Sequence, residues 1–148
     1  MSIEHNYEVS VNWNINRRGT LTSPDLHNEI EVATPPQFPN GIEGIWSPEH
    51  LFVAAINSCL MTTFLSIADN SKLEFLNFNS KASGKLEMID GKYIMNEVTL
   101  MPVLTIKNKK DRERAQRILE KSEAACLISN SVKSKIILKA EVVVAAIV

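Results

Sequence analysis

The sequence predicts one α+β domain in which largely antiparallel strands surround a central buried helix. Segments that alternate apolar and polar residues, as half-buried strands do, lie before and between two helical segments. Asp90-Gly91 separates two such segments and is a type I′ hairpin signal, which makes those strands antiparallel. The length of 148 residues corresponds to a single domain, residues 1–148.

The N-terminal third is predicted to form three strands and a loop. Residues 6–16 alternate as a half-buried strand does. Its apolar face comprises Tyr7, Val9, Val11, Trp13 and Ile15. Arg17-Arg18-Gly19 predicts a turn, and short strands are expected at residues 20–22 and 29–33. Three prolines and two glycines exclude regular structure from residues 34–46.

A long helix is predicted to begin at Ser47-Pro48-Glu49 and to end near residues 69–71. Ser47 suits the N-cap, Pro48 suits the first helical position, and Glu49 complements the helix dipole. The helix is apolar on nearly all sides, which indicates burial on all sides. One domain of this size can hardly enclose such a helix. We therefore expect a sheet to wrap it and a second subunit to cover one side.

Two strands joined by a hairpin are predicted to follow the long helix, at residues 75–88 and 92–106. Alternation of apolar and polar residues is visible in both segments. Pro102 lies within the second strand and has no N–H to donate, so it indicates a bulge or an edge position.

A second helix and a last strand complete the predicted domain. The helix is expected to begin near Asp111 as its N-cap and to bury one apolar stripe that ends at Cys126. Residues 136–148 are rich in β-branched side chains and predict a single strand. We expect the apolar end of that strand, residues 145–148, to be covered at a subunit interface.

Composition and charge exclude several functional classes. A formal net charge of −1 gives no electrostatic footprint for nucleic acid or for an anionic membrane. The N-terminus shows neither a basic region nor an apolar one, so we expect no signal peptide and a cytoplasmic location. The apolar runs fall short of the ~20 residues that a membrane-spanning helix requires.

Cys59 and Cys126 are the two cysteines, too few for a secreted disulfide framework. Three histidines beside them give no zinc-ligand spacing, so no metal site is expected. The simplest interpretation is a pair of inert core thiols. Both thiols nevertheless face inward on their predicted helices, and two packed helices can bring such residues within disulfide distance.

A reactive thiol must be a thiolate, and burial alone opposes ionisation. Cys59 lies too far along its helix for the helix dipole to help, so a cation is required. Arg17 and Arg18 are the candidates, and Glu49 can supply the carboxylate that a buried arginine needs. The alternative interpretation is that both arginines are solvated at the surface, and that Glu49 only interacts with the helix dipole.

These residues lie in segments that resemble a known family. Ser47-Pro48-Glu49-His50-Leu51-Phe52 followed by Asn57-Ser58-Cys59 resembles the N-P-E-x-L … A-x-C segment of the OsmC/Ohr family. Residues 123–129 resemble its second-cysteine segment, usually C-P-x-S. The resemblance implies an intertwined homodimer whose sheets wrap two central helices, with active sites at the subunit interface. It also implies reduction of hydroperoxides, often organic ones, in a stress response, without metal or other cofactor.

The resemblance assigns roles to individual residues. Cys59 matches the peroxidatic cysteine, which attacks the peroxide, and Cys126 matches the resolving cysteine, which closes a disulfide. An external dithiol then restores both thiols. Glu49 matches the carboxylate that holds the catalytic arginine, which is Arg17 or Arg18. The chain departs from the family at Leu127, where proline is usual, and at Ser47, where asparagine is usual. Two alternatives stay open, a non-enzymatic binding or stress protein and a structural dimer module.

Overall fold

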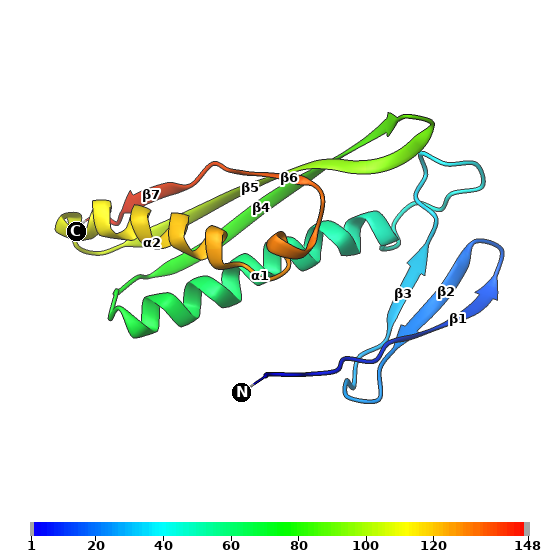
Figure 1. The fold of residues 1–148 in the computed structure, drawn as a ribbon, viewed down its shortest axis with the longest axis horizontal. Coiled ribbons are helices and arrows are strands. Elements are labelled where there is room, and N and C mark those ends of the chain that lie inside the picture. Colours follow the sequence, from blue (N-terminus) through cyan, green and yellow to red (C-terminus); the bar gives the residue numbers. More distant parts are fainter. Residues whose placement is uncertain (1, 147–148) are drawn as a thin grey trace. The chain divides into compact units, whose positions relative to one another are not determined.

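The computed structural model describes residues 2–146 of the chain. Two compact units are distinguished, Met1–Leu51 and Phe52–Val148. Figure 1 shows the elements of both units along the chain. The predicted α+β class is confirmed, since each unit has its own sheet and the second also packs helices on its sheet.

The first unit holds a three-stranded antiparallel sheet. Its strands are β1 (Ser10–Ile15), β2 (Arg18–Thr22) and β3 (Ile30–Ala33), in the order β1-β2-β3. The turn between β1 and β2 lies one residue earlier than predicted. Asn16 adopts a left-handed conformation with φ of 53°, so Arg18 and Gly19 already belong to β2. Asparagine tolerates this conformation better than arginine, which explains the shift.

Strand β1 corrects the prediction of a half-buried strand. It begins at Ser10 instead of residue 6, and both of its faces are exposed. Trp13 is 76% exposed, and Val11 and Ile15 also lie open to solvent. The alternation therefore marks an apolar face that nothing within the described residues covers.

The second unit is built on the hairpin of β4 (Asn77–Ile89) and β5 (Lys92–Ile106). Asp90 and Gly91 have φ of 50° and 78°, which confirms the type I′ turn. The C-terminal segment forms two strands, β6 (Lys135–Leu138) and β7 (Glu141–Val144), instead of the single strand predicted. Both pair with β5 in parallel, so this sheet is mixed. Residues 147 and 148 of the predicted strand lie outside the described residues.

Pro102 lies in the centre of this sheet, which corrects the expected bulge or edge position. It is buried in β5 and opposite Ser80 of β4. On the other side of β5, the pairing with β6 ends at Leu100 and the pairing with β7 resumes at Val103. A proline is tolerated here because it falls in the interval between the two short strands, where no ladder requires its missing N–H.

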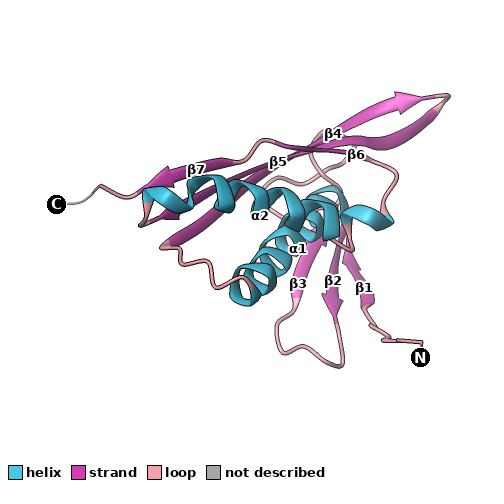
Figure 2. Cartoon of the chain, turned by 60° about the vertical axis from the view of Figure 1, so that its left-hand side comes forward, coloured by secondary structure: helices cyan, strands magenta, loops and turns pink. Residues whose placement is uncertain are grey.

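Helix α1 (Pro48–Asn70) and helix α2 (Arg112–Ala125) both lie on one face of this sheet (Figure 2). A short 3₁₀ turn, η1 (Lys109–Asp111), leads into α2. Asp111 takes the N-cap position as predicted, but its carboxylate pairs with Arg114 instead of capping the helix. The core forms between the helices and β5. Its members on β5 are Val98, Leu100, Leu104 and Ile106.

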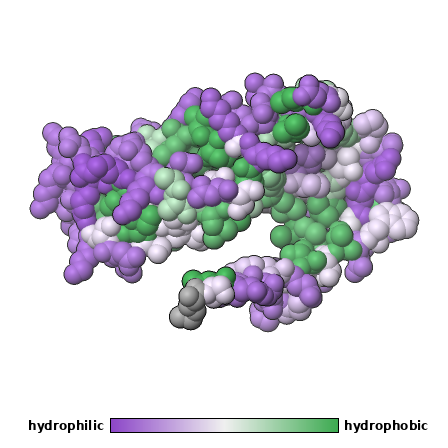
Figure 3. All heavy atoms as spheres, viewed as in Figure 1, coloured by the Kyte–Doolittle hydropathy of each residue, from purple (hydrophilic) through white to green (hydrophobic). Residues whose placement is uncertain are grey.

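Helix α1 is buried on one side only within the single chain. Ile56, Leu60 and Phe64 pack against the sheet, whereas Met61 and Leu65 are 39% and 41% exposed. Apolar residues reach the surface along α1 (Figure 3). By length and composition alone α1 could cross a membrane, with a mean hydropathy of 1.9. This corrects the expectation that the apolar runs are too short, although the core helix of a globular protein meets the same criterion.

Candidate functional site

Cys59 lies midway along α1, on the side that faces the sheet and the segment after α2. Its side chain is 9% exposed. Thr63, one helical turn later, places its hydroxyl oxygen 3.8 Å from the Cys59 sulfur. Cys59 thus occupies a position that is largely closed to water but has polar neighbours.

Cys126 lies immediately after the last residue of α2 and is fully buried. The chain leaves the helix here in an extended conformation, with φ of −67° and ψ of 114°. Both cysteines are free thiols. The two thiols lie near enough for each to affect the pKa of the other. The fold therefore brings together two sulfurs that are 67 positions apart in the sequence.

The surroundings of Cys59 favour its thiolate. Burial raises the pKa of the Cys59 thiol, but hydrogen bonds to its sulfur outweigh burial and hold the pKa below the ordinary value of 9.0. The donors are, in order of effect, the Cys126 thiol, the Ile128 N–H, the Thr63 hydroxyl and the Leu127 N–H. The lowered pKa of Cys59 thus reflects the polar groups around its sulfur, among which the Cys126 thiol has the largest lowering effect.

The surroundings of Cys126 favour its neutral thiol. Burial raises the pKa of Cys126, and so does its hydrogen bond with Cys59. Contacts with the hydroxyl and N–H of Ser129 only partly offset this rise. The pair is therefore asymmetric, with Cys59 as the more acidic thiol and Cys126 as the less acidic one. In such a pair one thiol is the nucleophile, and the other stays neutral.

Asn57 fixes α1 to the sheet two residues before Cys59. Its amide nitrogen donates to the Ser80 carbonyl oxygen at 2.9 Å, and its amide oxygen accepts from the Ser80 hydroxyl at 2.6 Å. Because both groups of one side chain are engaged by one residue of β4, the rotation of α1 is defined near Cys59. Sequence reasoning missed this contact, although an asparagine inside an apolar helix is a signal for a specific polar partner.

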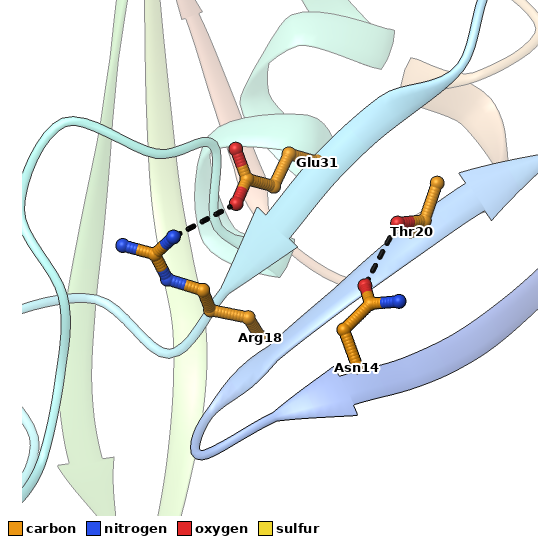
Figure 4. A network of polar contacts seen from close by, with 4 residues as sticks. All are labelled: Asn14, Arg18, Thr20 and Glu31. Carbon is orange, nitrogen blue, oxygen red and sulfur yellow. Dashed lines mark hydrogen bonds and ion pairs between the residues drawn. The ribbon is translucent and has the colours of Figure 1, made fainter.

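The two predicted arginines lie at the turn and on β2. Arg18 donates to the Glu31 carboxylate of β3 at 3.2 Å, beside the hydrogen bond between Thr20 and Asn14 (Figure 4). Both partners of the ion pair are substantially exposed, so the pair contributes little to stability. Sequence reasoning did not identify Glu31 as the partner. Arg17 lies exposed in the turn.

Glu49 has an unusual carboxylate at the start of α1. Its Oε1 atom is shielded from solvent and has no hydrogen-bond partner among the described residues. A buried carboxylate oxygen without a donor is costly, which indicates that a donor belongs there. The N-cap prediction is confirmed next to it, because the Ser47 hydroxyl accepts the His50 N–H at 3.1 Å.

Comparisons with known proteins agree with this fold. A family model described as "OsmC-like protein" matches residues 41–141. The uncharacterized protein YmaD of Bacillus subtilis (strain 168) is 23% identical over 143 residues, with 93% of each chain covered.

Two solved structures illustrate the likeness. An OsmC-like protein of unknown function from Vibrio cholerae has a TM-score of 0.82 at 24% identity, with 93% of this chain and 99% of that chain covered. An organic hydroperoxide resistance protein from Elizabethkingia anophelis has a TM-score of 0.75 at 21% identity, with 98% and 100% covered. At these identities the likeness to the two structures shows the fold alone.

Proposed function

Because the chain belongs to the OsmC-like protein family, we propose that it is a cysteine-based peroxidase that reduces organic hydroperoxides. The observation that carries the proposal is the asymmetric thiol pair, in which Cys59 is the acidic member and Cys126 its buried neighbour. A thiolate with a second thiol nearby suits thiol-based peroxide reduction, because the sulfenic acid formed on the first thiol can condense with the second.

The reaction proceeds in three balanced steps. The Cys59 thiolate attacks the terminal oxygen of the hydroperoxide, the O–O bond breaks, and the leaving alkoxide takes a proton and departs as an alcohol. The sulfenic acid on Cys59 then condenses with the Cys126 thiol, which forms a disulfide and releases water. An external dithiol exchanges with this disulfide, restores both thiols and is itself oxidised.

The proposed roles of the remaining residues follow from charge. Arg17 or Arg18 is the proposed cation of the site, and Glu49 is its proposed carboxylate partner. The unpartnered Oε1 atom of Glu49 supports this assignment, since a guanidinium would supply the missing donor. No step requires a metal, flavin or haem.

Replacement of the resolving cysteine tests the second step. In the absence of a dithiol, Cys126→Ser should consume one equivalent of cumene hydroperoxide and stop with a sulfenic acid on Cys59. Stopped-flow measurement of the peroxide and a dimedone adduct located by mass spectrometry check this outcome. If wild type with a dithiol consumes neither cumene hydroperoxide nor hydrogen peroxide, the protein is a non-enzymatic member of the family.

We also propose that the protein is a cytoplasmic homodimer. Two apolar surfaces support the dimer. One lies on β1 with Val11, Trp13 and Ile15, and the other lies on α1 with Met61 and Leu65. Exposed apolar surfaces of this kind are typical of subunit interfaces. Light scattering is expected to give twice the 16.5 kDa of one chain, and a monomer at micromolar concentration would contradict the proposal.

A further inference from the structure

Two neighbouring threonines follow Cys59 in α1, and their hydroxyl groups contact different atoms of that cysteine. The Thr62 hydroxyl donates to the Cys59 carbonyl oxygen at 3.2 Å, which is the usual contact of a threonine inside a helix. The Thr63 hydroxyl oxygen lies 3.8 Å from the Cys59 sulfur instead, within hydrogen-bond distance for sulfur. Thr63 therefore contacts the thiol, whereas Thr62 contacts the helix backbone.

We propose that Thr63 is a catalytic residue of the peroxide reduction, and that its hydroxyl donates a hydrogen bond to the Cys59 thiolate. The inference deepens the proposed function and rests on it for its catalytic meaning. The contact joins the hydroxyl directly to the sulfur that attacks the peroxide, so Thr63 acts on a reacting atom.

This hydrogen bond persists in both protonation states of Cys59. While the thiol is neutral, either atom can be the donor. Once the thiol has lost its proton, the sulfur can only accept, so the hydroxyl is the donor. A hydrogen bond to a charged acceptor is about twice as strong as one between neutral groups, so the contact favours the thiolate. The lowered pKa of Cys59 agrees with this, because the Thr63 hydroxyl is one of the groups that lower it.

Burial and helix geometry make this hydroxyl hard to replace. Cys59 is 9% exposed, so little water can reach its sulfur in place of the hydroxyl. Residues four positions apart lie on the same face of a helix, so the backbone of α1 already places Thr63 beside Cys59. Because threonine is branched at Cβ, it has few rotamers in a helix, and little side-chain entropy is lost when its hydroxyl binds the thiolate.

Two opposing effects decide how the hydroxyl changes the rate of attack. It raises the fraction of Cys59 that is thiolate, but it also makes each thiolate a weaker nucleophile. For a tenfold increase in the thiolate fraction, the nucleophilicity of each thiolate falls by only about threefold. The gain in thiolate is therefore the larger effect, and the hydroxyl accelerates the attack wherever the pH lies below the pKa of Cys59.

Thr63→Val tests the hydroxyl, because valine has nearly the same shape and has no donor. The background is Cys126→Ser, which leaves Cys59 as the one cysteine and removes the titratable neighbour that affects its pKa. Alkylation of Cys59 by iodoacetamide, measured across a range of pH, should have its midpoint at a higher pH in Thr63→Val than in the parent. Below that midpoint, the alkylation should be about threefold slower.

The adjacent threonine and a conservative variant provide matched controls. Thr62→Val removes a hydroxyl that contacts the backbone, and Thr63→Ser keeps a hydroxyl beside the sulfur, so both should retain the parent's midpoint. Thr63→Ala removes the same hydroxyl with a stronger helix former and should behave as Thr63→Val does, which guards against a folding defect of the valine variant.

The same substitutions with Cys126 present connect the hydroxyl to the reaction. Thr63→Val should lower kcat/KM for cumene hydroperoxide by about threefold at a pH below the midpoint, and Thr62→Val should not. Equal alkylation midpoints for Thr63→Val and Thr62→Val, or a Thr63→Ser midpoint that matches Thr63→Val, would overturn the proposal. The alkylation uses no peroxide, so a lack of peroxidase activity in wild type would overturn the proposed function and leave the hydrogen bond to the thiolate standing.

Discussion

Cys59→Ser is expected to abolish the reduction of cumene hydroperoxide, to below one part in a thousand of the wild-type rate. The serine hydroxyl is not ionised near neutral pH and is a far weaker nucleophile than a thiolate. Cys126 does not substitute for it, because Cys126 is fully buried and burial raises the pKa of its thiol. Steady-state consumption of the hydroperoxide with a dithiol measures the loss.

The matched control for this variant is Ser58→Ala. Ser58 is exposed next to Cys59 and hydrogen-bonds the Ala55 carbonyl within the same helix, so its loss should leave the rate within twofold of wild type. The wild-type rate should fall as pH falls through the pKa of Cys59, because protonation removes the nucleophile. Since that pKa is lowered, the midpoint should lie below that of an ordinary cysteine. Undiminished turnover in Cys59→Ser would show that another group carries the chemistry.

Phe64→Ala is expected to give the largest loss of stability, about 3–5 kcal/mol. Phe64 is fully buried in α1 and contacts two other aromatic rings. Its ring lies 5.2 Å from that of Phe75, edge to face, and 5.0 Å from that of Phe78, stacked. The substitution removes these contacts and leaves a cavity between α1 and the sheet.

Urea unfolding followed by circular dichroism measures this effect. Leu76→Ala is the matched control, because Leu76 precedes β4 with an exposed side chain and should cost less than about 1 kcal/mol. A loss from Phe64→Ala no greater than that of the control would show that α1 does not pack on the sheet as described.

Short sequence motifs predicted the helix start, the hairpin turn and the buried helix face, because each of these depends on neighbouring residues in the chain. Ser47 and Pro48 gave the start of α1, and the Ser47 cap is made as expected. Asp90-Gly91 gave the hairpin, because its two left-handed residues suit a type I′ turn. The apolar stripe of α2 gave its buried face, which ends in the buried Cys126.

Tertiary pairing decided the features that sequence reasoning missed. The β-branched C-terminal segment reads as one strand, but it pairs with β5 as two short parallel strands on either side of Pro102. Alternation in β1 does not say what covers its apolar face, and nothing does within the described residues. The hairpin signal predicted antiparallel pairing of β4 and β5, and it could not predict that β6 and β7 pair with β5 in parallel.

The site was predictable in its side chains and not in its backbone donors. Two inward-facing cysteines on two helices indicated that the sulfurs could meet, and the effect of each thiol on the pKa of the other agrees with that inference. The N–H groups of Leu127 and Ile128 leave no pattern in the sequence, because every residue except proline has such a donor. The partner of Arg18 was missed for another reason, since Glu31 lies on a neighbouring strand whose register no short motif specifies.

Disulfide mapping tests most directly whether the two sulfurs act as one redox pair. Wild-type protein would receive one equivalent of cumene hydroperoxide without dithiol and be digested under acidic conditions for mass spectrometry. We expect the chain to lose two hydrogen atoms and to yield one linked peptide pair that contains Cys59 and Cys126. Recovery of both cysteines as free thiols, with the hydroperoxide either intact or consumed, would contradict the account.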